Sequence, residues 1–299
     1  MRPSVDISRD WPPEILGRCP EVVRLREALP GLARLDIPVW VSGETGTGKS
    51  LFVRHLHRMS SMQGPLVVVS CSAPTAELEI FGWAEGAFAW ARRSQEGALA
   101  RASGGVLYLD DLPSLGLEVQ ERLLRAFKLG TFAPLGSLTT TKIHCKLACS
   151  GHLDLEEEVQ RGSLREDLAT LISGAPLHCP PLRERGKDIE ELARHFLATV
   201  ARDHGRAAPA LTRDHADRLR VHRWSGNMVE LRSWIENLVL VGEFPEVLPT
   251  AGADLSLADM ERLLVADTLR RHGGNRMKAA EALGIGERTL YRKIRKYAL

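Results

Sequence analysis

The segment that most constrains the fold of this chain lies at residues 43–50. It reads Gly-Glu-Thr-Gly-Thr-Gly-Lys-Ser and matches the phosphate-binding pattern G-x-x-x-x-G-K-[ST] at every position. Its glycines let the backbone curl so that successive N–H groups point at phosphate oxygens. A strand-like apolar run at residues 39–41 precedes it, and a helical pattern at residues 50–59 follows it. This order of strand, loop and helix favours a nucleotide-binding loop over a chance glycine-rich turn.

The residue types within this loop predict its ligands. The helix that follows adds its positive end to a phosphate site. Lys49 supplies a positive charge to the β- and γ-phosphates, and the Ser50 hydroxyl can bind Mg²⁺. The predicted cofactors are therefore ATP and Mg²⁺. The residues expected to bind them are Gly43, Glu44, Thr45, Gly46, Thr47, Gly48, Lys49 and Ser50.

A pair of aspartates follows a second buried strand. Residues 106–109 read Val-Leu-Tyr-Leu, and Asp110 and Asp111 come directly after them. We expect Asp110 to help hold Mg²⁺ and Asp111 to orient the attacking water. By themselves the two could cap a helix. Their position about 60 residues after the phosphate-binding loop favours the catalytic interpretation.

The pattern along the chain predicts the fold class. From residue 14 to residue 181, short apolar runs alternate with helical patterns, which indicates an α/β fold with a mainly parallel sheet. Residues 142–150 could add a further strand. After residue 181, the segments 188–203, 214–221 and 227–241 all have helical patterns, and Asp188 and Asp214 could cap the first two. The predicted domains are an N-terminal tail (1–13), an α/β nucleotide-binding subdomain (14–181), a helical lid subdomain (182–242), a linker (243–255) and an all-α domain (256–299).

The last 25 residues carry a net charge of +5, which leaves −3 for the rest of the chain. A basic module at one end suggests an anionic partner there. A helix is expected to start at Ser256, a second at residues 276–283 and a third at residues 287–297, with a glycine-rich turn between the last two. Leu290, Ile294 and Tyr297 should face the core. A solvated basic helix is the alternative to a recognition helix. The candidate DNA contacts are Arg276, Lys278, Arg288, Thr289, Tyr291, Arg292, Lys293 and Lys296.

Cysteine usage and apolar content predict the compartment. The five cysteines form no regular framework, which argues for a reducing environment. A metal site at Cys145 and Cys149 is not expected, because no second ligand pair is spaced to complete it. The N-terminal residues carry charges and prolines in place of a signal peptide, and no run approaches the roughly 18 apolar residues of a membrane span. We therefore expect a cytoplasmic protein.

Several motifs together resemble the sigma-54-dependent activators, the bacterial enhancer-binding proteins. Besides the phosphate-binding loop, they are Phe-Gly-Trp-Ala-Glu-Gly-Ala-Phe (81–88), Gly-Gly-Val-Leu-Tyr-Leu-Asp (104–110), Leu-Arg-Glu-Asp-Leu (164–168) and Pro-Pro-Leu-Arg-Glu-Arg (180–185). Residues 274–293 are similar to a Fis-type helix-turn-helix. The resemblance covers nearly the whole chain. It implies an AAA+ P-loop NTPase domain with a helical lid and a DNA-binding domain. With about 13 residues ahead of the AAA+ part, we expect the family's N-terminal sensory domain to be missing.

The loop that contacts the sigma factor departs from the family's pattern, G-A-F-T-G-A. Here the loop is Gly86, Ala87, Phe88, Ala89, Trp90 and Ala91. Ala89 stands where the resemblance implies a threonine that touches the sigma factor. Trp90 stands in place of a glycine and cannot adopt a positive φ cheaply. We call residues 86–91 the contact loop.

The residues implied in hydrolysis depart as well. The family's second nucleotide motif ends in Asp-Glu, whereas here it ends in two aspartates, so Asp111 is one methylene shorter. Arg165 matches the first of two arginine fingers, but Leu171 stands at the second position. A sensing arginine of the lid is replaced by Val229, whereas His152 is compatible with the polar sensor at the end of a strand. These losses predict ATP binding with impaired hydrolysis.

The favoured hypothesis is a sequence-specific DNA-binding transcription regulator with an oligomeric AAA+ core that ATP controls. Its expected partners are double-stranded DNA at an upstream promoter or enhancer site, RNA polymerase holoenzyme, with sigma-54 as its candidate sigma factor, and further copies or paralogues of the chain. One alternative is a fully active sigma-54 activator ATPase. A second is a non-catalytic partner subunit that lends DNA affinity to an active paralogue.

Overall fold

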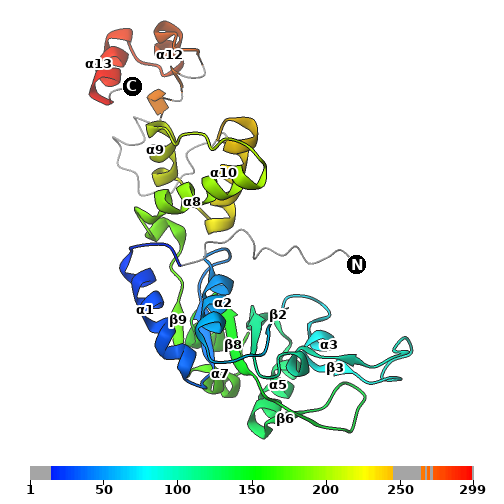
Figure 1. Ribbon diagram of the computed structural model, residues 1–299. Coiled ribbons are helices and arrows are strands. Elements are labelled where there is room, and N and C mark those ends of the chain that lie inside the picture. The colour runs from blue at the N-terminus through cyan, green and yellow to red at the C-terminus, as the bar shows by residue number, and fades with distance from the viewer. Residues whose placement is uncertain (1–14, 245–263, 267, 270–271, 298–299) are drawn as a thin grey trace. The chain divides into compact units, whose positions relative to one another are not determined.

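The computed structural model describes residues 15–244, 264–266, 268–269 and 272–297 (Figure 1). The chain divides into two compact units. The first comprises residues 1–216 and 224–244, and the second comprises residues 217–223 and 245–299. Within the described residues, no helix combines the length and apolarity that crossing a bilayer requires.

A five-stranded parallel sheet forms the centre of the first unit, which confirms the predicted α/β class. Its strand order is β2-β5-β8-β1-β9. The strands are β1 (Val39–Ser42), β2 (Leu66–Ser70), β5 (Val106–Asp110), β8 (Lys146–Gly151) and β9 (Pro176–His178). The central strands are apolar along their length because helices cover both of their faces.

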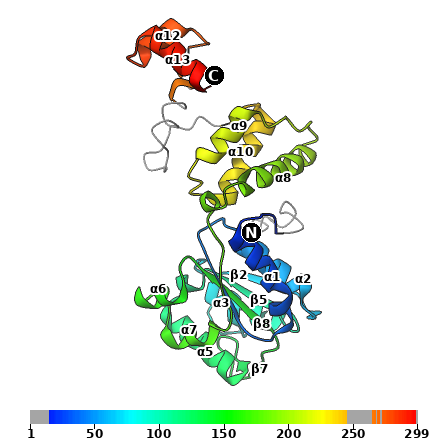
Figure 2. The ribbon, with the colours of Figure 1, turned by 90° about the vertical axis from the view of Figure 1, so that its left-hand side faces the viewer.

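Side chains of alternate residues enter two separate cores. Val39 and Val41 pack with Tyr108 beneath helices α1 and α2. Trp40 points the other way and packs with Leu107 and Leu109 against helices α3, α4, α5 and α7. Figure 2 shows the sheet between these two sets of helices. The helices are α1 (Pro20–Arg34), α2 (Lys49–Met59), α3 (Ala76–Phe81), α4 (Ala98–Arg101), α5 (Leu117–Leu129), α6 (Leu155–Gln160) and α7 (Glu166–Ile172).

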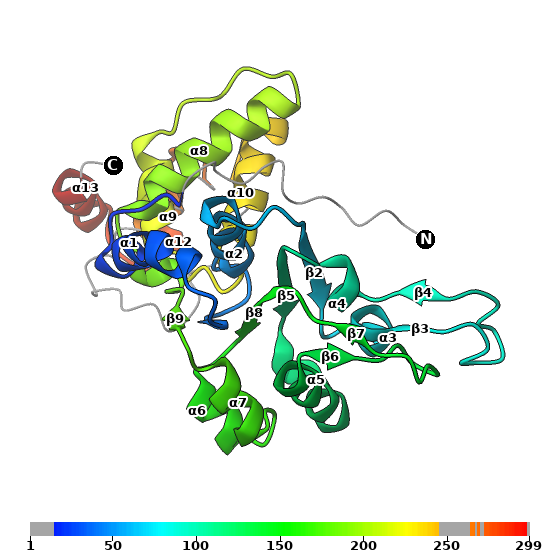
Figure 3. The same cartoon turned by 60° about the horizontal axis from the view of Figure 1, so that its bottom comes forward.

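Two short hairpins lie side by side at one edge of this unit (Figure 3). The first pairs β3 (Gly82–Trp83) with β4 (Gln95–Glu96), and the second pairs β6 (Thr131–Phe132) with β7 (Thr141–Lys142). A bridge between Trp83 and Leu135 connects them. The single strand expected at residues 142–150 is wrong in part, because β7 and β8 are separate there and belong to different sheets.

The lid consists of α8 (Asp188–Asp203), α9 (Arg213–Val221) and α10 (Asn227–Val241), close to the bounds predicted from sequence. The predicted capping role of Asp188 is wrong. Its carboxylate instead accepts the backbone N–H groups of Arg18, at 2.7 Å, and Cys19, at 3.1 Å. The capping role of Asp214 is also wrong, because this residue lies inside the first turn of α9, and the Thr212 hydroxyl accepts the N–H of His215.

The second unit contains α12 (Arg276–Ala282) and α13 (Glu287–Tyr297), as predicted. The Asn275 side chain caps α12 by accepting the N–H of Lys278. Leu290 is fully buried against Ala279 and Ala280, and Ile294 packs on the same cluster. The predicted helix start at Ser256 lies outside the described residues.

Candidate functional site

The phosphate-binding loop lies at the carboxyl end of β1 and runs into the first turn of α2. Gly43, Gly46 and Gly48 have φ values of 141°, 80° and 103°, a region that L side chains rarely adopt. A Cβ atom on Gly48 would also lie 2.5 Å from Cε of Met228. Both the backbone angles and the close packing explain why glycine stands at these positions.

The loop offers unpaired donors to an anion. In the part of the chain that the structure describes, the N–H groups of Gly48, Lys49 and Ser50 donate no hydrogen bond to protein. The buried Lys49 ammonium lies against the same loop and donates to the carbonyls of Gly43 and Glu44. Burial lowers the pKa of Lys49, and the nearby carboxylates of Asp110 and Asp111 oppose that shift. These groups fit a polyphosphate.

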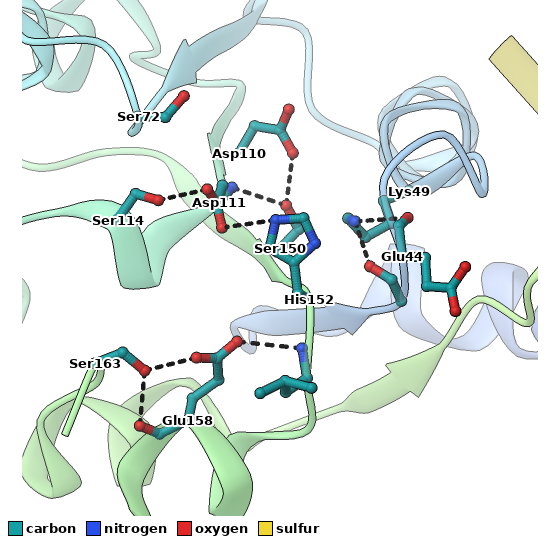
Figure 4. A network of polar contacts seen from close by, with 12 residues as sticks. Glu44, Lys49, Ser72, Asp110, Asp111, Ser114, Ser150, His152, Glu158 and Ser163 are labelled. Atoms are coloured by element: carbon teal, nitrogen blue, oxygen red, sulfur yellow. Dashed lines mark hydrogen bonds and ion pairs between the residues drawn. The ribbon is translucent and has the colours of Figure 1, made fainter. Parts of the chain in front are cut away.

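Asp110 is the last residue of β5, and Asp111 follows it. Both lie opposite Lys49 in the site (Figure 4). Asp110 Oδ1 accepts the Ser150 hydroxyl at 2.7 Å. Asp111 has a φ of 62° and accepts the Ser114 hydroxyl. His152 Nε2 lies 3.6 Å from Asp111 Oδ1. The structure therefore brings the candidate residues Lys49, Asp110, Asp111 and His152 together.

Mg²⁺ fits this site only together with a nucleotide. The described residues contain no group of three or more His, Cys, Asp or Glu side chains that could hold a metal ion. Ser50 and Asp110 each offer an oxygen, which is the ligand type that Mg²⁺ prefers, and phosphates commonly complete its shell. These two residues are therefore candidates for holding the ion against a bound nucleotide.

The lid contacts the loop through residues that the sequence analysis did not single out. Arg183 donates two hydrogen bonds to the Glu44 carboxylate, at 2.7 and 2.9 Å. These bonds are the main reason that the pKa of Glu44 is lowered. The N–H of Met228 donates to the Gly46 carbonyl at 3.0 Å. Arg183 and Met228 thus join the lid to the loop by an ion pair and a backbone hydrogen bond.

Asn227 makes the most extensive of these contacts. It is fully buried, and its φ of 51° is unusual for a residue with a side chain. Its Oδ1 accepts the Leu182 N–H at 2.8 Å. Its Nδ2 donates to Glu44, at 3.1 Å, and to the Thr45 carbonyl, at 2.9 Å. One amide side chain therefore connects the start of the lid to the phosphate-binding loop.

A small cavity adjoins the loop. Its lining is mostly apolar and includes Ile15, Leu16, Gly48, Leu192 and Met228. It is formed by the N-terminal segment, the loop and the lid together. Its volume is about 30 Å³, close to that of one water molecule, so a larger apolar group would enter only if the lining residues moved apart.

Of the remaining residues implied in hydrolysis, Arg165 and Leu171 make contacts outside the phosphate-binding loop, whereas Val229 lies beside it. The Arg165 guanidinium pairs with Asp167 at 2.8 Å and with Glu121 at 3.5 Å. Leu171 packs against the larger core. Val229 is 57% exposed, and its Cγ2 would lie 3.4 Å from a Cβ atom on Gly46. A valine therefore lies beside the phosphate-binding loop, where an arginine was implied.

The contact loop is closed on itself. The N–H of Gly86 donates to the Ala91 carbonyl at 2.8 Å, and Ala91 is buried. Phe88 and Trp90 stack with ring centroids 5.1 Å apart, and Trp83 meets Trp90 edge-on at 5.4 Å. We call Trp83, Phe88 and Trp90 the aromatic cluster. Trp90 avoids a positive φ, and its side chain remains more than half exposed.

Most of the candidate DNA contacts lie on the surface of the second unit. Arg276, Lys278, Arg288, Tyr291, Arg292 and Lys296 are exposed, whereas Thr289 and Lys293 are partly buried. The Arg276 guanidinium lies over the Tyr291 ring and donates to its hydroxyl at 3.1 Å. This stacking holds one arginine of α12 against α13, which the sequence pattern did not predict.

Comparison with known proteins covers all three parts of the chain. Residues 15–178 match the sigma-54 interaction domain, residues 183–251 match the AAA+ ATPase lid domain, and residues 256–297 match the Fis family of bacterial regulatory proteins. The C4-dicarboxylate transport regulator DctD of Pseudomonas aeruginosa is 36% identical over 95% of this chain. The regulator NtrC of Escherichia coli K12 is 31% identical over 96% of it. The chain spans 64% of the length of DctD and 70% of the length of NtrC.

Among solved structures, NtrX of Brucella abortus in complex with ATP is similar to this chain. The TM-score is 0.71 at 29% identity, with 98% of this chain and 71% of that chain covered. The complex of NtrX with ADP gives a TM-score of 0.70 at 28% identity, with 96% of this chain and 69% of that chain covered.

The contacts of Asn227 lead to a prediction about stability. Asn227→Ala leaves the buried Leu182 N–H without an acceptor and should lower the free energy of unfolding by about 2–4 kcal/mol. Arg183→Ala is the matched control, because it removes an ion pair that is about 40% exposed, and should cost under about 1 kcal/mol. Urea denaturation measures both values. Equal losses in the two variants would contradict the anchoring role of Asn227.

Proposed function

The chain belongs to the family of sigma-54-dependent transcriptional activators, and on this premise we propose that it is a DNA-binding transcription regulator that binds Mg-ATP and hydrolyses it weakly. The observation that carries the proposal is the phosphate-binding loop, whose unpaired N–H groups and Lys49 face Asp110 and Asp111. We further propose that it acts in the cytoplasm, in keeping with its five free cysteines.

Each part of the site has a proposed role in binding. The N–H groups at the start of α2 bind the phosphates because they are unpaired donors at a helix N-terminus, and the Lys49 ammonium adds a positive charge beside them. The apolar cavity beside Gly48 is the proposed position of the adenine ring, and its lining must move apart to receive the ring because the cavity volume is only about 30 Å³. Ser50 and Asp110 hold Mg²⁺, which when bound neutralises charge on the phosphates. The complex of NtrX with ATP supports this choice of nucleotide.

Weak hydrolysis is proposed from the residues around the phosphates. An arginine finger is worth about 10³–10⁵ in rate, which corresponds to roughly 4–7 kcal/mol of barrier. Leu171 is engaged in the core and offers no charge. Val229 likewise supplies none beside Gly46. We propose that Asp111 and Arg165 serve the reaction, with Arg165 acting on a neighbouring copy in an oligomer.

Nucleotide binding can be measured directly. Calorimetry with Mg-ATP should show saturable binding by the full chain. Lys49→Ala should abolish that binding because it removes the positive charge from the loop. Arg202→Ala, which changes an exposed arginine at the end of α8, is the control and should bind as the wild type does. Absence of heat or of a thermal shift with the wild-type chain would contradict the proposal.

DNA binding should depend on the basic face of the second unit. Arg and Lys displace counterions from phosphates, so the affinity for promoter DNA should fall steeply with salt. Deletion of residues 256–299 should remove binding. A plot of log affinity against log salt concentration has a negative slope. Arg292→Ala and Lys296→Ala should each make that slope shallower by roughly 1. If the truncated chain shifts promoter fragments as well as the full chain does, this module has another role.

The contact loop is proposed to couple poorly to sigma-54. Ala89 lacks a hydroxyl, and Trp90 is held by ring contacts within the chain instead of leaving the loop tip free. Each aromatic pair is worth about 0.5–1.5 kcal/mol beyond the area it buries. A loop that is packed in this way resists the movement that ATP turnover would need to impose on it.

Transcription in vitro tests this coupling. The purified chain with ATP should form few open complexes at a sigma-54 promoter. Ala89→Thr with Trp90→Gly should raise open-complex formation if the loop is limiting. Abundant open complexes with the wild-type chain would favour the alternative of a fully active activator. Activity that appears only when an active paralogue is mixed in would favour the non-catalytic partner subunit.

A further inference from the structure

Tyr108 lies inside the nucleotide site although no catalytic motif calls for a tyrosine there. It precedes Asp110 by two residues in β5, so both side chains are on the same face of the sheet. Its ring is fully buried beneath α2, with Phe52 and Val53. Its hydroxyl reaches past this core and lies 2.7 Å from Asp110 Oδ1 and 3.0 Å from Ser150 Oγ.

The hydroxyl group acts as a donor to the carboxylate. An ionised carboxylate has no proton to give, so the phenol donates and Asp110 Oδ1 accepts across the 2.7 Å contact. Ser150 also donates to Asp110 Oδ1, at 2.7 Å. An ionised carboxylate offers about four acceptor sites on two oxygens. Two hydroxyl donors therefore occupy Oδ1 and leave Oδ2 for other ligands.

The same network reaches Asp111. The N–H of Asp111 donates to Ser150 Oγ at 3.1 Å, so the hydroxyl that supports Asp110 also holds the backbone of the next residue. Asp111 needs such support because its φ of 62° is costly for a residue with a Cβ atom.

We propose that Tyr108 is a positioning residue that, together with Ser150, fixes the carboxylate of Asp110 with Oδ2 directed to the magnesium ion of bound Mg-ATP. This inference rests on the proposed binding of Mg-ATP. The hydroxyl does not touch the nucleotide and acts through Asp110. Its effect should therefore appear in the part of the ATP affinity that depends on Mg²⁺ and be absent from the part that depends on the phosphate-binding loop.

Calorimetry with the full chain separates the two parts. ATP is titrated in saturating Mg²⁺ and again in EDTA, with the wild type and Tyr108→Phe, which keeps the ring and removes only the hydroxyl. In EDTA the two proteins should agree within about twofold, because Lys49 and the loop are unchanged. The factor by which Mg²⁺ raises the affinity for ATP should be about tenfold smaller in Tyr108→Phe than in the wild type. A change of this size is expected for one lost hydrogen bond to a charged group. Tyr297→Phe, which removes a hydroxyl from α13, is the matched control and should behave as the wild type does.

Several results would overturn the positioning role. Equal weakening of ATP in Mg²⁺ and in EDTA would show that the hydroxyl only supports the fold. An unchanged magnesium effect would show that the hydroxyl has no role. A larger magnesium effect in Tyr108→Phe would show that the phenol competes with the ion for Asp110. If the wild type does not bind ATP at all, the proposed function is overturned and the inference falls with it. The wild-type titration shows this result before any variant is compared.

Discussion

The buried amide of Asn227 is the contact on which the geometry of this nucleotide site depends. Its oxygen holds the Leu182 N–H at the start of the lid, and its nitrogen holds Glu44 and Thr45 in the phosphate-binding loop. The loop turns through glycines with positive φ, so its conformation needs outside support. Because the lid provides that support, a change of loop conformation on nucleotide binding must also be felt by α10, which begins at Asn227.

Two hydrogen-bond networks meet at the phosphates from opposite sides. Asn227 and Arg183 hold the loop from the lid, and Tyr108 and Ser150 hold Asp110 from the sheet. Both networks are intact in a chain that has Leu171 and Val229 at the positions of two implied arginines. The side chains proposed to position nucleotide and metal are thus present, whereas two of the arginines implied by the family resemblance are replaced by uncharged residues. This pattern is consistent with a domain in which nucleotide occupancy matters more than turnover.

The elements predicted best from sequence were those in which apolar residues recur at a regular spacing over a long segment. The bounds of α8, α10 and α13 matched because apolar residues recur at helical spacing and glycine or proline punctuates their ends. The strands β3, β4, β6 and β7 were missed because each has two residues, too few for a pattern to develop. Asp188 was misread as a cap because its real partners, the N–H groups of Arg18 and Cys19, lie about 170 residues away in sequence. Ser150 and Asn227 were missed for the same reason, whereas the alternation of Tyr108 with Asp110 could have indicated its role.

The aromatic cluster shows how a loop can lose its flexibility without strain. A glycine at the loop tip allows conformations that a tryptophan cannot adopt, yet Trp90 shows no positive φ, and the loop is closed by the hydrogen bond between Gly86 and Ala91. The ring contacts of Trp83 and Phe88 stabilise this closed form in the free protein. Any partner that needs the loop extended must therefore break these contacts before it gains its own. A partner that accepts the closed form meets a preformed surface in which Trp90 is already ordered, and loses less entropy on binding. The substitution that we propose to weaken the contact with sigma-54 would thus favour a partner that recognises the closed loop.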